Sequence, residues 1–258
     1  MARVLAVGGC HWDIRYVGKR ELIPGESTPA TSKRSPGGAV SNVARTLRGL
    51  GHQVSIASVV GNTPSPEDDL RLFRHVPDLA TASYVTVENP DGSLAYGLAD
   101  MEIYAHLDHA FYAGLAQEAA GADLVLVDCN APGEAVAGLL DTGVRPVGIA
   151  VSPAKVGNFE GVLDRLSAMF MNAAEAEVLG AGLGQLPMAV VTSGADGARL
   201  LERGQQVVHF PAPDFQPAHV NGLGDRLAGL TLDLLMAGAS WAGALEQALE
   251  RLPKEMER

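Results

Sequence analysis

The sequence predicts an α/β fold in which helices flank a mainly parallel central sheet. Short, continuous apolar runs that end in glycine or in polar residues indicate strands buried on both faces. Segments with helical periodicity lie between most of these runs, and this alternation is typical of parallel sheets. The 258 residues suit one such domain, so we expect a single domain over residues 1–258.

The first elements follow directly from the local pattern. "RVLAVGG" (3–9) is a continuous apolar run that ends in two glycines, and it predicts a buried strand. "AVSNVARTLRGLG" (39–51) has helical periodicity, and Gly51 ends the helix. "HQVSIASVVG" (52–61) predicts the second strand of the core.

The later strands end in polar side chains. Their apolar runs are "ADLVLVDCN" (122–130), "RPVGIAVS" (145–152), "AMFMN" (168–172) and "MAVVTSG" (188–194). Helix-like segments such as "APGEAVAGLLD" separate most of them. Ligands of open α/β sheets bind beyond the carboxyl ends of the strands. The polar residues near those ends are therefore candidates for a binding site: Asp13, Asp128, Asn130, Asn172 and Thr192.

Two segments interrupt the alternation of strands and helices. Residues 14–35 are polar and turn-rich, and residues 82–101 predict a β-hairpin with "NPDG" (89–92) as its turn. Together they could form a small β-sheet over the strand ends, which would act as a lid. The alternative is a peripheral hairpin without a functional role.

The composition restricts the classes of binding partner and the cellular location that we expect. A formal net charge of -11 argues against a general affinity for nucleic acid. No apolar run approaches the roughly 20 residues of a membrane helix, and "MARVLAVGG" is too short for a signal peptide. Cys10 and Cys129 end apolar runs and are expected to be buried free thiols. We expect a cytoplasmic protein with neither nucleic acid nor membrane as a partner.

Two early motifs could contact a polar substrate. In "GGCHWD", Asp13 could accept two hydroxyl hydrogen bonds, as sugar recognition requires, or could be an ordinary turn residue. In "SPGGAVSN" (35–42), two glycines precede a helix, so backbone amides could face a small ligand. His11 and Trp12 lack partners at a diagnostic spacing, and we interpret them as structural or lid-edge residues.

Three later motifs could contact a nucleotide or the reacting atoms. Asn172 and Glu175 follow a strand, where helix capping alone would explain both. Thr192 and Gly194 could meet a phosphate or only shape a turn. "GLGD" (222–225) combines glycines, a helix start and a carboxylate. This combination suits either an anion site with a base beside it or a simple helix junction.

The order of these motifs resembles that of the ribokinase-like (PfkB) carbohydrate kinases over nearly the whole chain. That family has an early glycine pair, a "GG…N" helix start, an N-x-x-E element, a T-x-G turn and a late "GAGD" signature. The counterparts here are "GGCHWD", "PGGAVSN", "NAAE", "TSG" and "GLGD". The resemblance implies a large α/β domain with a β lid, and ATP-dependent phosphorylation of a hydroxymethyl group on a sugar or nucleoside. It also implies Mg²⁺ as a cofactor. It is compatible with a monovalent cation such as K⁺ and with a homodimer formed through the lid.

Within this family the sequence is most similar to the pseudouridine kinases. The similarity is carried by "LIPGESTPATSKRSPGGAVSNVARTLRGLG", "LADMEIYAHL", "DCNAP" and "VSPAK". It implies phosphorylation of the 5′-hydroxyl of a nucleoside, with pseudouridine first. The alternatives are a kinase for a free sugar such as ribose or a ketohexose, and a degenerate relative that binds without turnover. A dinucleotide oxidoreductase is disfavoured because "GGCHWD" lacks the G-x-G-x-x-G spacing.

The resemblance also implies a role for each matching residue. Substrate contacts fall to Asp13, Gly37, Gly38, Asn42 and Asn130, with Lys155 beside them. ATP contacts fall to Asn172, Glu175, Thr192, Gly194 and Gly197, with Glu175 holding magnesium through water. The anion hole would be Gly222, Leu223 and Gly224. Asp225 would be the catalytic base, and the helix dipole should keep it ionised and weakly basic.

Several positions depart from the family pattern. Leu223 replaces the alanine of the signature. Arg226 follows the aspartate where relatives carry a small residue, and it could pair with Asp225, reach a phosphate or point to solvent. "GNTPSPEDD" replaces the family's "GDDxxG", and the helix-and-loop segment between Asn62 and Ala82 is short. The sequence ends at "LEQALERLPKEMER", where relatives continue with a segment that helps to wall the adenine site. These departures should weaken nucleotide affinity more than substrate recognition.

Overall fold

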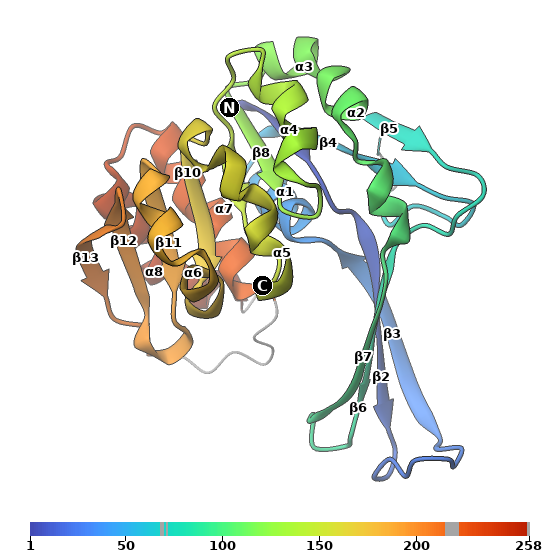
Figure 1. Ribbon diagram of the computed structural model, residues 1–258. Coiled ribbons are helices and arrows are strands. Elements are labelled where there is room, and N and C mark those ends of the chain that lie inside the picture. Colours follow the sequence, from blue (N-terminus) through green and yellow to red (C-terminus); the bar gives the residue numbers. More distant parts are fainter. Residues whose placement is uncertain (68–69, 71, 215–221, 257–258) are drawn as a thin grey trace.

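The computed structural model describes residues 1–67, 70, 72–214 and 222–256, and its elements follow the predicted α/β order (Figure 1). The strands are β1 (Arg3–Val7), β2 (His11–Gly18), β3 (Ala30–Gly37), β4 (Gln53–Val60), β5 (Leu72–His75), β6 (Ser83–Glu88), β7 (Leu94–Asp100), β8 (Leu124–Asp128), β9 (Val147–Ile149), β10 (Ala168–Asn172), β11 (Met188–Thr192), β12 (Ala198–Glu202) and β13 (Gln205–Phe210). The α-helices are α1 (Ala39–Gly49), α2 (His109–Ala113), α3 (Ala116–Ala120), α4 (Gly133–Leu140), α5 (Pro153–Val156), α6 (Ala173–Leu179), α7 (Leu223–Met236) and α8 (Trp241–Met256). The 3₁₀ helices are η1 (Glu102–His106), η2 (Gly157–Arg165), η3 (Gly180–Gln185) and η4 (Gly194–Asp196).

A large, mainly parallel sheet lies at the centre of the molecule. Within the described residues it has nine strands, in the order β13-β12-β11-β10-β9-β8-β1-β4-β5. All neighbours from β5 to β11 pair in parallel, whereas β12 and β13 add an antiparallel edge. The fold class predicted from the alternating pattern is confirmed.

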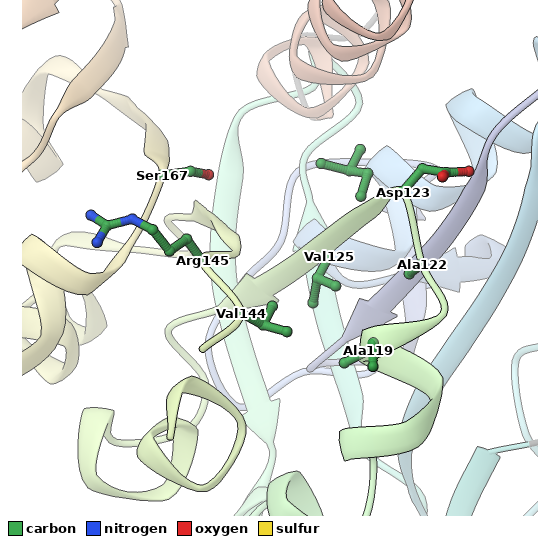
Figure 2. A pocket seen from close by; sticks show the side chains of 9 residues that line it. Ala119, Ala122, Asp123, Val125, Val144, Arg145 and Ser167 are labelled. Atoms are coloured by element: carbon green, nitrogen blue, oxygen red, sulfur yellow. The ribbon is translucent and has the colours of Figure 1, made fainter. Parts of the chain in front are cut away.

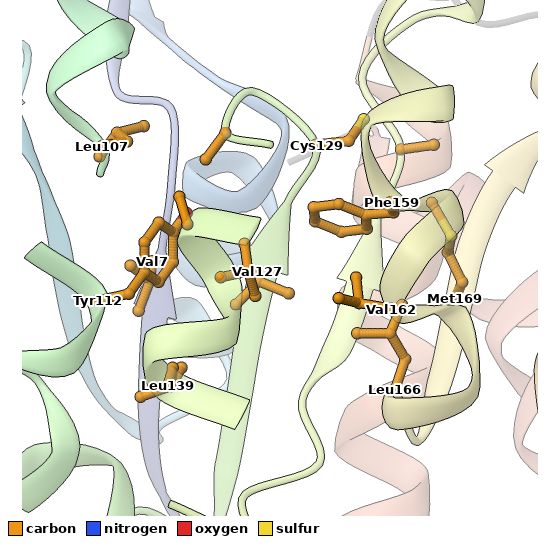
Figure 3. Packing of buried hydrophobic residues seen from close by; sticks show 14 of the residues in the cluster. Val7, Leu107, Tyr112, Val127, Cys129, Leu139, Phe159, Val162, Leu166 and Met169 are labelled. Atoms are coloured by element: carbon orange, nitrogen blue, oxygen red, sulfur yellow. The ribbon is translucent and has the colours of Figure 1, made fainter. Parts of the chain in front are cut away.

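Helices cover both faces of the large sheet. Successive residues of a strand point to opposite faces, so each strand contributes side chains to both layers of the core. In β1, Leu5 and Val7 join a core cluster with residues of α2, α4, η2 and α6, part of which is drawn in Figure 3. Val4 and Ala6 join a second cluster with residues of α1, α7 and α8. This burial on both faces explains the continuous apolar runs in the sequence.

A smaller four-stranded sheet projects from the body of the molecule as a twisted ribbon (Figure 1). Its order is β3-β2-β6-β7, with β2 parallel to β6 and antiparallel to β3, and with β6 antiparallel to β7. The predicted hairpin is confirmed: β6 and β7 join at Asn89–Gly92, where the Gly92 N–H donates to the Asn89 carbonyl at 2.9 Å. We call this unit the small sheet.

Two local expectations need correction. The first segment of the small sheet is longer than residues 14–35, since β2 already begins at His11 and β3 ends at Gly37. Asp13 is therefore a strand residue rather than part of a turn. The stretch between Asn62 and Ala82, expected as helix and loop, contains the edge strand β5, which pairs with β4.

The cysteines and the lengths of the helices can be compared with the sequence-based expectations. Cys10 and Cys129 are buried free thiols, as predicted. None of the helices in the described ranges combines the length and the apolar character that crossing a membrane requires.

Candidate active site

Glycines let the loop after β1 and the start of α1 come into direct contact. Gly38 has φ +109°, and a Cβ there would collide with the Gly9 carbonyl. A Cβ on Gly37 would lie 2.5 Å from the Asp13 carboxyl carbon. The Ser41 hydroxyl donates to the Gly9 carbonyl at 2.8 Å and fixes this contact. The absence of side chains at Gly37 and Gly38 therefore leaves space for the Asp13 carboxyl group and for the Gly9 carbonyl.

A fully buried carboxylate anchors the same loop. Asp128, at the end of β8, accepts hydrogen bonds from the backbone N–H groups of Gly9 at 2.8 Å and Asn130 at 3.1 Å. Burial raises the pKa of Asp128, while these hydrogen bonds act in the opposite direction. A Cβ at Gly8 would meet the same carboxyl group at 2.5 Å. Asp128 thus fixes the loop that leads from β1 to β2.

A hydrogen-bonded row of side chains orients Asp13. The Nε2 atom of His11 lies 3.2 Å from Asp13 Oδ1, and its Nδ1 atom lies 3.0 Å from the hydroxyl of buried Tyr104. Sequence reasoning treated His11 as structural. The signal that could have found it is its spacing, because residues two apart in a strand share a face.

Asn130, which follows β8, contacts Lys155 of α5. Lys155 Nζ donates to Asn130 Oδ1 at 2.6 Å and lies 5.7 Å from the centre of the Tyr104 ring. Tyr104 therefore links this pair to the row that ends at Asp13. Five side chains from four segments of the sequence form one polar cluster: His11, Asp13, Tyr104, Asn130 and Lys155.

The start of α7 has the geometry expected of an anion site. Gly222 adopts the left-handed conformation, with φ 79°, and precedes the first helical residue, Leu223. The first N–H groups of a helix lack partners within it and carry partial positive charge. Gly224 presents no side chain there. A Cβ on it would lie 4.0 Å from the Thr192 hydroxyl, so the predicted nucleotide turn faces the predicted anion hole.

Asp225 lies in the first turn of α7, and its Oδ2 atom accepts a hydrogen bond from Asn42 Nδ2 at 2.7 Å. Burial raises the pKa of Asp225 to about 6; the Asn42 hydrogen bond and the charge of Arg45 oppose this rise, and the charges of Asp128 and Glu175 add to it. The sequence predicts an ionised, weakly basic carboxylate, and burial in the structure makes Asp225 more basic than an exposed aspartate. Asp225 is still mainly ionised at pH 7, yet it is a better base than an ordinary aspartate.

Asn172 and Glu175 form a complete capping box at the start of α6. Asn172 Oδ1 accepts from the Glu175 N–H at 2.9 Å, and Glu175 Oε2 accepts from the Asn172 N–H at 2.7 Å. Burial raises the pKa of Glu175. The capping explanation offered by the sequence is correct, and the second carboxylate oxygen of Glu175 is outside this box.

The turn after β11 is shaped by its glycines. Gly194 and Gly197 have φ +57° and +88°, and a Cβ on Gly197 would collide with the Phe210 carbonyl.

Among the described residues, no cluster of three or more His, Cys, Asp or Glu side chains is arranged to hold a metal ion. Magnesium in phosphate-transferring sites often has one or two protein carboxylates plus phosphate oxygens, so the single carboxylate of Glu175 fits an ion that arrives with a nucleotide.

An open pocket of about 370 Å³ lies elsewhere (Figure 2). Its lining includes Asp123, Arg145 and Ser167, which immediately precede or flank the amino ends of β8, β9 and β10. It is therefore at the opposite edge of the large sheet from the predicted site, and it contains none of the predicted residues.

Comparison with known proteins supports the same fold. No protein-family model matches the chain. The pseudouridine kinase of Escherichia coli (strain K12) is 26% identical over 189 residues, which cover 68% of this chain and 60% of that kinase. The aligned part of the chain thus spans less than two thirds of that relative's length.

Solved structures match over almost the whole chain. A carbohydrate kinase from Agrobacterium tumefaciens has a TM-score of 0.84 and 26% identity, and the match covers 98% of this chain and 90% of that one. The Arabidopsis thaliana ribokinase complexed with ribose and ATP has a TM-score of 0.76 and 16% identity, covering 100% and 93%. The Burkholderia thailandensis nucleoside kinase in complex with inosine has a TM-score of 0.72 and 19% identity, covering 100% and 92%. The chain therefore has the ribokinase-like carbohydrate kinase fold, and the proteins that it resembles are phosphotransferases acting on hydroxyl groups.

Proposed function

We propose that the protein is an ATP-dependent kinase that phosphorylates the 5′-hydroxyl of a nucleoside, with pseudouridine as the preferred acceptor. One observation carries the proposal. Asp225, a carboxylate with a raised pKa, lies in the first turn of α7 and follows Gly224, at which a Cβ would lie 4.0 Å from the Thr192 hydroxyl. Phosphoryl transfer depends on positioning and charge stabilisation, which this arrangement supplies.

Each group at the start of α7 would have a separate role in phosphoryl transfer. The acceptor hydroxyl would lie between Asp225 and the N–H groups that follow Gly222. Its oxygen forms a bond to the γ-phosphorus as the bond to the β,γ-bridging oxygen breaks, and ADP leaves. Asp225 takes the hydroxyl proton, and the N–H groups of Leu223 and Gly224 stabilise charge on the transferred group. Magnesium, when bound with ATP, would neutralise phosphate charge, with Glu175 as its protein carboxylate.

The substrate side of the site suits a ribosyl group with a polar base. The proposed ribose contact is Asp13, which His11 orients and which lies against Gly37. Lys155, held by the Asn130 amide oxygen, offers an ammonium donor next to Tyr104, which would suit a carbonyl oxygen of a base. The pseudouridine kinase relative favours a nucleoside over a free sugar. A cytoplasmic location and stimulation by K⁺ remain predictions from the sequence.

An acceptor panel tests this function. The release of ADP would be measured with pseudouridine, uridine, ribose and fructose at equal concentrations. We expect pseudouridine to give the highest kcat/KM, because the base contacts add binding that a free sugar cannot use. A free sugar that exceeds it tenfold or more would contradict the nucleoside assignment. Binding of a nucleoside without turnover of any acceptor would make the protein a non-catalytic relative.

We further propose that two copies associate through the small sheet. One face of it carries aligned apolar rows, Ile14–Val85–Leu98 and Tyr16–Val87–Tyr96. Tyr96 and Leu98 are 52% and 60% exposed. Asp13 belongs to the other face, because adjacent residues of β2 point to opposite sides. A second copy that covers the apolar rows would leave Asp13 available to substrate.

The dimer is tested with a charge placed on this face. Sedimentation velocity should show a wild-type dimer, and Leu98→Lys should weaken the association at least about tenfold, because a lysine would have to be desolvated in the interface. Val207→Lys is the matched control, since Val207 is an exposed apolar residue of β13, outside the small sheet. A wild-type protein that is monomeric at every concentration would contradict the proposal.

A further inference from the structure

We infer that Arg45 is a positioning residue: anchored by Glu67, it fixes the amide of Asn42 so that the NH₂ group faces the catalytic carboxylate of Asp225. The inference rests on the proposed function of Asp225 as base. Arg45 and Glu67 are not among the site residues that the sequence motifs predict. Arg45 and Glu67 would act on the reaction through Asn42, without touching either substrate.

The contacts form a continuous row from the protein surface to the base. Arg45 and Asn42 are three residues apart in α1, so their side chains lie on the same face of the helix. Arg45 donates to Asn42 Oδ1, and Asn42 Nδ2 donates to Asp225 Oδ2 at 2.7 Å. Arg45 also donates to the Pro36 carbonyl at 3.1 Å, which ties it to the end of β3.

Glu67 holds the outer end of this row. Its side chain is only 7% exposed, and it forms an ion pair with Arg45. Its second oxygen, Oε2, lies 3.4 Å from Arg48. A largely buried carboxylate needs such partners, because an unpaired buried charge is costly. The guanidinium of Arg45 is therefore held between Glu67 on one side and Asn42 on the other.

The donor properties of Arg45 determine which way the Asn42 amide faces. An amide can present either oxygen or NH₂ in nearly the same shape, and its neighbours decide between them. A guanidinium group only donates hydrogen bonds, so the amide oxygen must face Arg45. The NH₂ group then faces Asp225, and one of its two hydrogens remains for a substrate hydroxyl. Without Arg45 the amide could turn over and place its oxygen against the carboxylate.

The charged and polar groups around Asp225 indicate how this row of side chains changes the pKa of the base. Asp128 from β8 and Glu175 from α6 raise the pKa of Asp225, in addition to burial. Asn42 and Arg45, both from α1, lower it, and Arg226 follows Asp225 in α7. Loss of Arg45 removes a positive charge and loosens the hydrogen bond from Asn42. Both changes move the pKa of Asp225 upward, so less of the base is ionised at a given pH.

Activity against pH is the first test. For the wild type, kcat should fall as the pH drops below about 6, because the protonated carboxyl cannot accept a proton. Arg45→Met should move this acid limb upward by about one pH unit and lower kcat near pH 6 about fivefold, with a smaller change in KM. Arg45→Lys should restore part of the loss. Arg48→Met is the control, because Arg48 contacts Glu67 without reaching Asn42 in the described contacts, and its acid limb should match the wild type.

A titration without substrates separates this inference from the proposed function. The ¹³C resonance of the Asp225 carboxyl, assigned by its loss in Asp225→Asn, would be followed against pH in the wild type and in Arg45→Met. An upward move of the midpoint in Arg45→Met supports the positioning role, even if no acceptor is phosphorylated and the proposed function fails. Equal midpoints overturn it, even if the enzyme is active. Should Arg45→Met fail to fold, Asn42→Ala removes the hydrogen bond to Asp225 that Arg45 is inferred to hold in place, and the midpoint must again move upward.

Discussion

Replacing Asp225 with asparagine should lower kcat about 10²–10⁴-fold, which is the usual contribution of a positioned general base. Asparagine keeps the shape of the side chain and the start of α7, but it cannot accept the proton of the acceptor hydroxyl. The KM for the acceptor should change little, because the lost interaction strengthens mainly in the transition state. Steady-state kinetics at saturating ATP measure both quantities.

The stability of the same variant discriminates between a base and a simple helix cap. If Asp225 only complemented the helix dipole, its replacement would cost about 0.3–1 kcal/mol of unfolding free energy and leave turnover intact. The pKa of Asp225 is instead raised from 3.8 to about 6. A raised carboxyl pKa favours the folded state at low pH, and this contribution disappears as the pH rises through about 6. Asparagine has no charge to desolvate, so Asp225→Asn should be at least as stable as the wild type at pH 7.

Asp233→Asn is a matched control on the same helix. Asp233 lies 3.0 Å from His52 and 3.5 Å from Arg251, away from the anion hole. We expect it to affect stability and to leave kcat near the wild-type value. Equal activity of Asp225→Asn and Asp233→Asn would exclude Asp225 as the base.

Replacing Asp13 with alanine should weaken acceptor binding roughly tenfold to over a hundredfold. The proposed partners of Asp13 are ribose hydroxyls, and losing hydrogen bonds to a charged group costs about 1.5–3 kcal/mol. The effect should appear in the Kd and KM for the nucleoside, with a smaller change in kcat, because the proposed partners of Asp13 are not the reacting atoms. Isothermal titration calorimetry with pseudouridine measures the Kd directly.

Asp100→Ala supplies the comparison within the small sheet. Asp100 is an exposed residue at the end of β7, and its removal should leave the acceptor Kd unchanged. Asp13 would be structural after all if Asp13→Ala kept the wild-type Kd and lost thermal stability. The row from Tyr104 through His11 predicts an intermediate result for His11→Ala, since it orients Asp13 without contacting the ribose.

Local sequence pattern was sufficient for most of the fold. Continuous apolar runs mark the strands of the large sheet because both of its faces are covered by helices. Turn chemistry marked the β6–β7 hairpin through "NPDG". The edge strand β5 was not predicted, because its four residues are only partly buried and lack a continuous apolar run. The early start of β2 was missed because His11, Trp12 and Asp13 do not resemble a typical strand.

The site was predictable only where a motif is contiguous in the sequence. Gly222, Gly224 and Asp225 are neighbours, and the helix start they define is a local feature. The contact between Asn42 and Asp225 joins residues 183 positions apart, so it depends on how α1 and α7 pack on the same face of the sheet. The raised pKa of Asp225 depends on that packing too, because burial is a tertiary property.

Transfer of the γ-phosphate of ATP to the nucleoside 5′-hydroxyl is tested most directly by following where that phosphate goes. Wild-type protein, ATP, Mg²⁺ and pseudouridine would be followed together by ³¹P NMR. We expect a new phosphomonoester resonance, coupled to the 5′-methylene protons, that grows in step with ADP. Formation of inorganic phosphate alone, or unchanged ATP with pseudouridine bound, would contradict phosphoryl transfer to the nucleoside hydroxyl.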